Sequence, residues 1–209
     1  MRGANILSEA MGLLRAVAFL VPAASLCAGE GTFARLEEAA AGVRTVQSDF
    51  VQEKHLSVFR EVITSKGRFA FEKPDRLRWE ILEPVRTGFV ITAKEGRRWN
   101  ERTGRTESFD LDRDPTMRAV IGQILAWARA DFTALRREYR IRVLAEEPAD
   151  LRLEPMDPKA DPFLDYLRIS FVADGRHVKV VEVHERGGDW TRIVFARTVL
   201  NEPLPPGTF

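Results

Sequence analysis

The sequence contains very few residues of the kinds that form disulfides or bind metals. Cys27 is the one cysteine among 209 residues, and His55, His177 and His184 are the three histidines. A single cysteine excludes a disulfide framework, so the folded domain must be held together by packing alone. The histidines do not have metal-ligand spacing, and the last two would face opposite sides of one predicted strand. We therefore expect no metal and no cofactor.

The sequence also lacks an excess of charge of either sign. It has 32 lysines and arginines against 31 aspartates and glutamates, a formal net charge of +1. Nucleic acids and other acidic polymers need a concentrated basic surface, so we expect no nucleic-acid partner. The basic pairs Arg97-Arg98 and Arg136-Arg137 are interpreted as solvated surface. Because repeats, low-complexity linkers and charge blocks are missing too, a single domain is favoured.

Long hydrophobic runs are absent, but a short one lies near the N-terminus. In residues 11–27, MGLLRAVAFLVPAASLC, an arginine precedes the apolar run, and a proline and small residues follow it. This order is typical of a secretory signal peptide, with a buried N-terminal helix as the alternative. We predict a signal peptide over residues 1–28 and one mature domain over residues 29–209. A lipoprotein signal needs a small residue before Cys27, and Leu26 stands there, so a soluble exported protein is favoured over a lipid-anchored one.

Capping residues and helical spacing predict three helices. Residues 31–42 form the first, with Thr32 as N-cap, and residues 115–128 form the second, after Asp114 and a proline at the first helical position. A shorter third helix begins after Asp131. The predicted apolar stripes are Phe33, Leu36 and Ala40 in the first helix, and Met117, Val120, Ile121, Ile124, Leu125 and Ala128 in the second.

Alternation of apolar and polar residues predicts strands in the remainder of the chain. We expect about six strands before the second helix and five after the third, separated by short turns. In the first long hairpin, one strand has apolar positions of one parity and the next strand has its own, as expected for long antiparallel strands: Val46, Phe50, Leu56 and Val58, then Ile63, Gly67, Phe69 and Phe71. The predicted fold is therefore α+β and mainly β, with a large twisted antiparallel sheet that should curl.

The hairpin FEKPDRLRW, residues 71–79, supplies the candidate binding surface. Its turn contains Lys73, Pro74 with a fixed φ, and Asp75 with a turn-forming side chain. Inward positions of the hairpin, the next strand and the second helix combine into an apolar wall without a charged residue: Phe69, Phe71, Leu77, Trp79, Phe89, Ile91, Ile121, Ile124 and Leu125. Acyl chains suit such a wall, at about 0.8 kcal/mol for each buried methylene. Periodicity alone favours a sealed core over an open cavity.

Catalytic motifs are missing, so we expect no enzyme. No serine lies in a nucleophile elbow, and no glycine-rich phosphate loop is present. The acidic stretch at residues 109–114, FDLDRD, begins like a calcium loop, but Pro115 and Ile121 occupy the positions that need glycine and glutamate. This stretch is interpreted as a polar loop that ends in a helix cap.

Several short motifs, taken in order, carry a resemblance to a known family. They are QSDFVQ at 47–52, GRF at 67–69, KPDRLRW at 73–79, Pro84, and NEPLP at 201–205 with Phe209. From about Leu36 onward the chain resembles the outer-membrane lipoprotein carrier family, LolA. The resemblance implies an unclosed half β-barrel of about eleven antiparallel strands, with short helices over its concave face. It also implies a monomeric periplasmic carrier of lipoprotein acyl chains, with an inner-membrane ABC exporter and the outer-membrane receptor LolB as partners.

Two features depart from the family pattern. The best-known carriers have an arginine before the proline of the hairpin turn, where it latches the lid helices, and this chain has Lys73. Because lysine lacks the fixed fork of arginine, the resemblance implies that any lid latch is weaker here or is moved to Arg76 or Arg78. The chain also stops at Phe209, where the family usually continues into a final strand. It resembles the LolA-like subgroup that sometimes accompanies lipid or polyene biosynthesis, so the resemblance leaves a lipoprotein and a related lipid as alternative cargoes. The alternative function is a periplasmic module that senses lipoproteins.

Overall fold

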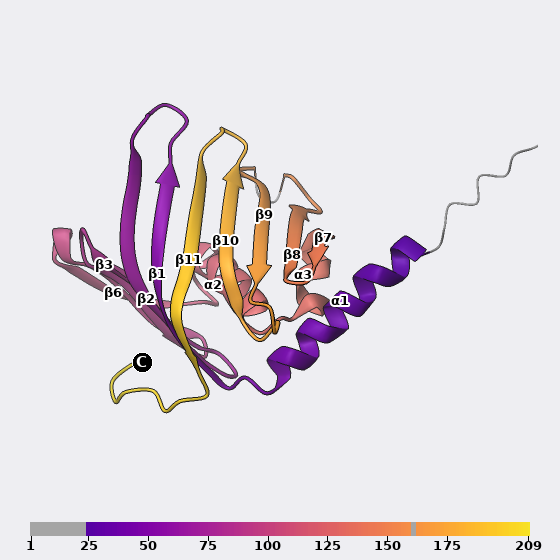
Figure 1. The fold of residues 1–209 in the computed structure, drawn as a ribbon. Helices are drawn as coiled ribbons and strands as arrows, with labels where there is room; N and C mark the ends of the chain where they lie inside the picture. The colour runs from indigo at the N-terminus through magenta and orange to yellow at the C-terminus, as the bar shows by residue number, and fades with distance from the viewer. Residues whose placement is uncertain (1–23, 160–161) are drawn as a thin grey trace, which may run out of the picture.

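The computed structural model describes residues 24–159 and 162–209, arranged as in Figure 1. Helix α1 (Ala24–Ala41) precedes β1 (Thr45–His55), β2 (Val62–Glu72), β3 (Arg76–Glu83), β4 (Thr87–Thr92), β5 (Glu95–Asn100), the 3-10 helix η1 (Glu101–Thr103) and β6 (Arg105–Asp110). Then follow α2 (Pro115–Ala128), α3 (Phe132–Glu138), β7 (Tyr139–Glu146), β8 (Ala149–Pro155), β9 (Leu164–Phe171), β10 (Val178–Glu185) and β11 (Trp190–Leu200). Residues 1–23 of the predicted signal peptide lie outside the described residues, so that assignment remains a prediction.

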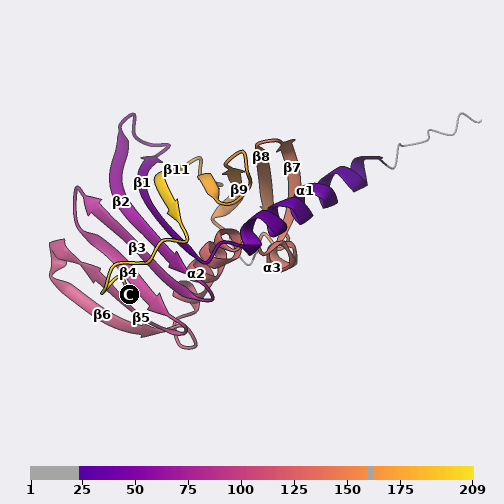
Figure 2. The ribbon, with the colours of Figure 1, turned by 60° about the horizontal axis from the view of Figure 1, so that its bottom comes forward.

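The eleven strands form one open antiparallel sheet, as predicted. Their order is β6-β5-β4-β3-β2-β1-β11-β10-β9-β8-β7, so β1 and β11 pair at the centre and β6 and β7 are the edges. Figure 2 shows the sheet bending around α2 and α3. The core lies between the concave face of the sheet and the helices, and Phe50, Leu77, Ile91, Leu151 and Ile169 are among its most buried side chains. The fold is the predicted half-barrel.

The alternation of the first hairpin continues beyond the region that the helices cover. Phe50, Phe69 and Phe71 are buried, but Ile63 is 50% exposed and Val58, in the connection after β1, is 80% exposed. The strand β1 ends at His55, so the predicted parity does not extend to Leu56 and Val58. Alternation determines which face a side chain points to, whereas burial also requires an element packed against that face.

The capping residues predicted where α2 and α3 begin, but the predicted start of α1 was wrong. Asp114 Oδ1 accepts a hydrogen bond from Met117 N at 2.9 Å, and Asp131 Oδ1 accepts one from Ala134 N at 2.9 Å, so both predicted caps are present. In contrast, α1 already begins at Ala24, and Thr32 is a buried residue inside it rather than its N-cap. Phe33, Leu36 and Ala40 are buried, as the predicted stripe of this helix requires.

The apolar stripe of α2 is rotated from the predicted one. Ile121 and Leu125 are buried, but Val120 is 43% exposed, and Trp127, which the prediction left out, is buried. The Trp127 ring lies 6.0 Å from the rings of both Phe69 and Phe195. The sheet extends around the last turn of α2, so a residue outside the simple stripe also finds an apolar neighbour there.

Two histidines participate in a row of stacked rings on the outer face of the sheet. Trp190 stacks on His55 at 3.8 Å and lies 5.7 Å from His184, which stacks on Tyr166 at 4.2 Å. His177 precedes β10 by one residue, so the expectation that it shares a strand with His184 is wrong. The described residues contain no cluster of three or more histidine, cysteine or acidic side chains that could hold a metal ion.

The segment after β11 returns over the outer face of the sheet, as Figure 2 shows. Thr45 Oγ1 donates to Glu202 O at 2.9 Å, Arg78 Nη1 donates to Thr208 O at 3.2 Å, and the Arg76 guanidinium lies 4.4 Å from the centre of the Phe209 ring. The C-terminal residues of the family motif, from Asn201 to Phe209, thus pack against β1 and β3. They occupy the face opposite to the helices.

Gly67→Ala is expected to lower the free energy of unfolding by about 1–3 kcal/mol, because a methyl group at this position overpacks the core. A Cβ atom there would lie 2.3 Å from both Glu80 O and Phe50 Cζ, and the backbone oxygen cannot move without disturbing β3. Gly122→Ala is the control, since nothing lies within 4 Å of that position in α2. It should raise the free energy of unfolding by about 0.5–1 kcal/mol. Urea denaturation of both variants tests this, and equal stabilities would contradict it.

Candidate functional site

Most of the predicted apolar wall is closed by helix α2. Phe71, Leu77, Ile91 and Ile121 are at most 1% exposed, and Phe69 and Leu125 are also buried. Trp79, Phe89 and Ile124 are partly buried and pack against this core. The structure therefore brings all nine predicted residues into one apolar cluster, in which six side chains are buried.

An open cavity of about 470 Å³ adjoins this cluster on the concave face of β3–β6. Its apolar lining comes from Trp79, Ile81, Phe89 and Met117, and the polar side chains around it include Thr87, Arg98, Asn100, Thr103, Arg105 and Glu107. The volume lies in the range of about 300–1,000 Å³ that is usual for small-molecule sites. Two of the predicted wall residues, Trp79 and Phe89, line this cavity.

An arginine bridges the cavity wall and the start of α2. Arg98 Nη2 lies 2.9 Å from Glu107 Oε2, and Arg98 Nη1 lies 3.5 Å from Asp114 Oδ2. Asp114 is also the N-cap of α2, so one carboxylate links the edge of the sheet to the first turn of the helix. The sequence did not predict this contact, because strand alternation shows that Arg98 faces the concave side but not which helix lies opposite to it.

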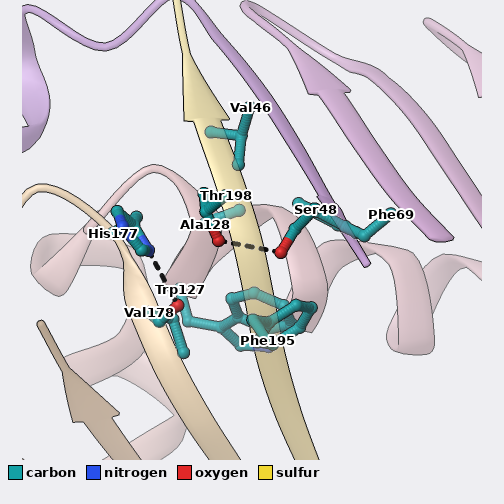
Figure 3. Close-up of a pocket in the computed structure, with 9 residues that line it drawn as sticks. All are labelled: Val46, Ser48, Phe69, Trp127, Ala128, His177, Val178, Phe195 and Thr198. Atoms are coloured by element: carbon teal, nitrogen blue, oxygen red, sulfur yellow. Dashed lines mark hydrogen bonds between the residues drawn. The ribbon is translucent and has the colours of Figure 1, made fainter. Parts of the chain in front are cut away.

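The space under the other end of α2 is nearly filled. The cavity in Figure 3 has a volume of about 20 Å³ and lies between Phe69, Trp127 and Phe195. On its polar side, Ser48 Oγ and Thr198 Oγ1 share a hydrogen bond of 2.8 Å. Such a space holds about one water molecule. An acyl chain can therefore extend inward from the open cavity only if α2 separates from the sheet.

Two cations join the hairpin turn after β2 to two different helices. Lys73 Nζ donates to Ala40 O at 2.9 Å and to Ala41 O at 3.3 Å, at the C-terminal end of α1. Arg129, which follows α2, donates from Nη2 to Pro74 O. The pKa of Lys73 is below its usual value because of burial first and the nearby Arg129 charge second. The expected contact of Lys73 with the helix at 115–128 is thus made by Arg129, and the structure places Lys73 against α1.

Comparison with known protein families agrees with the sequence resemblance. The family described as "Outer membrane lipoprotein carrier protein LolA" matches residues 41–209. The chain belongs to the LolA family. No curated protein shows a significant match. No helix among the described residues of this LolA-family chain is long and apolar enough to span a membrane.

Solved structures with a similar fold share little sequence with this chain. One is LppX, a lipoprotein of Mycobacterium tuberculosis, with 10% identity, a TM-score of 0.45, and coverage of 84% of this chain and 98% of that chain. Another is a putative outer membrane lipoprotein-sorting protein domain from Vibrio parahaemolyticus, with 12% identity, a TM-score of 0.42, and coverage of 88% and 94%. MucB in the MucA/MucB complex of Pseudomonas aeruginosa has 16% identity, a TM-score of 0.44, and coverage of 86% and 59%.

Proposed function

We propose that this protein binds acyl chains of lipoproteins or of a related lipid in its concave cavity and carries them across the periplasm. The observation that supports this most directly is the open apolar cavity beside the first turn of α2. Trp79, Ile81, Phe89 and Met117 would contact the chain there, next to the buried wall of the core. Membership of the LolA family supports a carrier rather than a catalyst.

Loading would widen the cavity by displacing α2. The buried residues Ile121 and Leu125 fix this helix to the sheet through apolar contacts, which an acyl chain could replace. Polar contacts at its two ends, Arg98 with Asp114 and Arg129 with Pro74, would break on opening and form again after release. A carrier needs this reversibility, because it must bind cargo and also give it up.

The remaining parts of the proposal concern transport. Residues 1–28 would direct export to the periplasm, and the mature monomer would receive its cargo from an inner-membrane ABC exporter. An outer-membrane receptor of the LolB kind would accept it. The alternative, a module that senses lipoproteins and binds a membrane regulator, predicts a protein that is purified without lipid. Mass spectrometry of the protein isolated from cells distinguishes the two, since a carrier should contain acylated material.

Phe89→Glu tests the cavity. The mature protein should bind a neutral probe, such as a pyrene-labelled fatty acid methyl ester, and this variant should bind it at least tenfold more weakly, because a carboxylate replaces an apolar wall. Phe89 is only partly buried, so the variant should remain folded.

The control is Phe59→Glu, the same change at a side chain that is 66% exposed and does not line the cavity. Fluorescence titration should give this variant the affinity of the wild type. Equal binding by the Phe89 variant, or no binding by the wild type, would contradict the proposed function.

A further inference from the structure

A second cavity, of about 510 Å³, lies on the opposite face of the same strands. Trp99 forms part of its lining, and a Cβ atom at Gly88 would lie 2.9 Å from Trp99 Cζ2, so the indole covers the glycine. Phe89, the next residue after Gly88, points to the concave face, as expected from strand alternation. We call this second cavity the outer groove and the first one the concave cavity.

The two cavities meet at one end of the sheet. Trp99, Asn100 and Arg105 line both of them. These residues flank η1, which connects β5 to β6 at the edge of the half-barrel. A ligand with an apolar part and a polar part can therefore lie across this end, with one part in each cavity.

Arginines dominate the charge around this junction. The charged residues that line the two cavities are five arginines and three glutamates, a formal excess of two positive charges. Part of this charge is neutralised within the protein. Arg78 donates to Glu80 Oε2 from Nε at 3.0 Å and from Nη2 at 2.9 Å, and Arg86 Nη2 lies 3.8 Å from Glu80 Oε1. On the concave side, Arg98 pairs with Glu107.

Arg97 and Arg105 are the two arginines that remain. Both are exposed, and neither forms an ion pair with a carboxylate of residues 24–159 or 162–209. The planar guanidinium group binds phosphate with two parallel hydrogen bonds, so a pair of unneutralised arginines beside a cavity favours a phosphate group. Trp99 beside them is held by the Arg78 guanidinium, 4.9 Å from its ring centre.

We propose that the cargo is an anionic amphiphile, with its acyl chain in the concave cavity and a phosphate headgroup in the outer groove, whose lining includes both Arg97 and Arg105. This inference rests on the proposed function, because it assumes that acyl chains occupy the concave cavity. It adds the chemical class of the headgroup, which the family alone does not specify. It also assigns a binding role to Arg97, one arginine of the Arg97-Arg98 pair that the sequence alone indicates to be solvated surface.

Two probes with the same chain length, and inorganic phosphate without a chain, test the headgroup. The mature protein is titrated by calorimetry with dodecyl phosphate below its micelle-forming concentration, with dodecanol below its solubility limit, and with inorganic phosphate. Dodecyl phosphate should bind at least tenfold more tightly than dodecanol, since hydrogen bonds to charged groups add to the burial of the chain. Raising the salt concentration should weaken only the phosphate probe.

The double variant Arg97→Gln/Arg105→Gln should lose this preference, with an affinity for dodecyl phosphate close to that for dodecanol. Its affinity for dodecanol should not change, because the apolar lining is intact. The matched control is Arg137→Gln/Arg140→Gln, which removes the same charge from two exposed positions that do not line either cavity. This control should retain the tenfold preference.

The possible failures can be told apart. If the neutral methyl ester and dodecanol both fail to bind, the proposed function is wrong. If they bind but dodecyl phosphate has no advantage, or if the arginine variant keeps that advantage, the headgroup site alone is wrong. If inorganic phosphate binds as tightly as dodecyl phosphate, the site binds free phosphate, and the proposal of an amphiphilic cargo is wrong.

Discussion

Phe71→Glu is expected to prevent the domain from folding, rather than only removing its ability to bind lipid. Phe71 has no exposed surface, and its neighbours across β1 and β3 are Val46 and Leu77, both buried. An unpaired carboxylate in such a place costs several kcal/mol, and a domain of this kind is stable by only about 5–15 kcal/mol. Far-UV circular dichroism and a urea titration of the purified variant measure the effect.

A conservative variant at the same position separates charge from shape. Phe71→Leu should remain folded and lose roughly 1–3 kcal/mol of its free energy of unfolding, because it leaves a small cavity but introduces no charge. The sequence allowed a different outcome, in which Phe71 lines an open cavity and the glutamate variant folds but does not bind ligand. A folded Phe71→Glu protein without ligand binding would show that α2 stands away from the sheet in solution.

Arg129→Gln is expected to speed the loading of a neutral acyl probe roughly tenfold. The guanidinium of Arg129 joins the end of α2 to the hairpin turn through Pro74 O, and this contact must break before the helix can separate from the sheet. A hydrogen bond from a charged donor contributes about 1.5 kcal/mol or more, and 1.4 kcal/mol corresponds to a factor of ten. Stopped-flow fluorescence with the pyrene-labelled methyl ester gives the loading and release rates.

Lys73→Leu tests whether Lys73, like Arg129, holds α2 against the sheet. Lys73 donates to carbonyl groups of α1, so its loss should leave loading through the α2 side within about twofold of the wild-type rate. Faster loading in the Lys73 variant than in the Arg129 variant would instead make Lys73 the lid latch, as the family resemblance implies. Unchanged loading rates in both variants would mean that the two cations stabilise the turn but do not control the opening of α2.

The candidate site was predictable only in part. Trp79 and Phe89 could be named from alternation because each strand residue must face one side or the other, and both line the concave cavity. Ile81 shares the parity of Trp79 and could have been included on the same grounds. Arg129 had no comparable signal, since its role depends on the hairpin turn at Pro74, which is 55 residues away in the sequence.

Local chemistry in the sequence was sufficient to determine the strands, the turn at Pro74 and Asp75, and the caps Asp114 and Asp131. These features depend on neighbouring residues, whose conformational preferences act within a few positions. It was not sufficient to separate sealed core from open cavity, because Phe71 and Phe89 both alternate as inward-facing strand residues, yet Phe71 is fully buried and Phe89 lines the concave cavity. The tertiary structure decided that, because burial depends on the packing of elements that are distant in the chain.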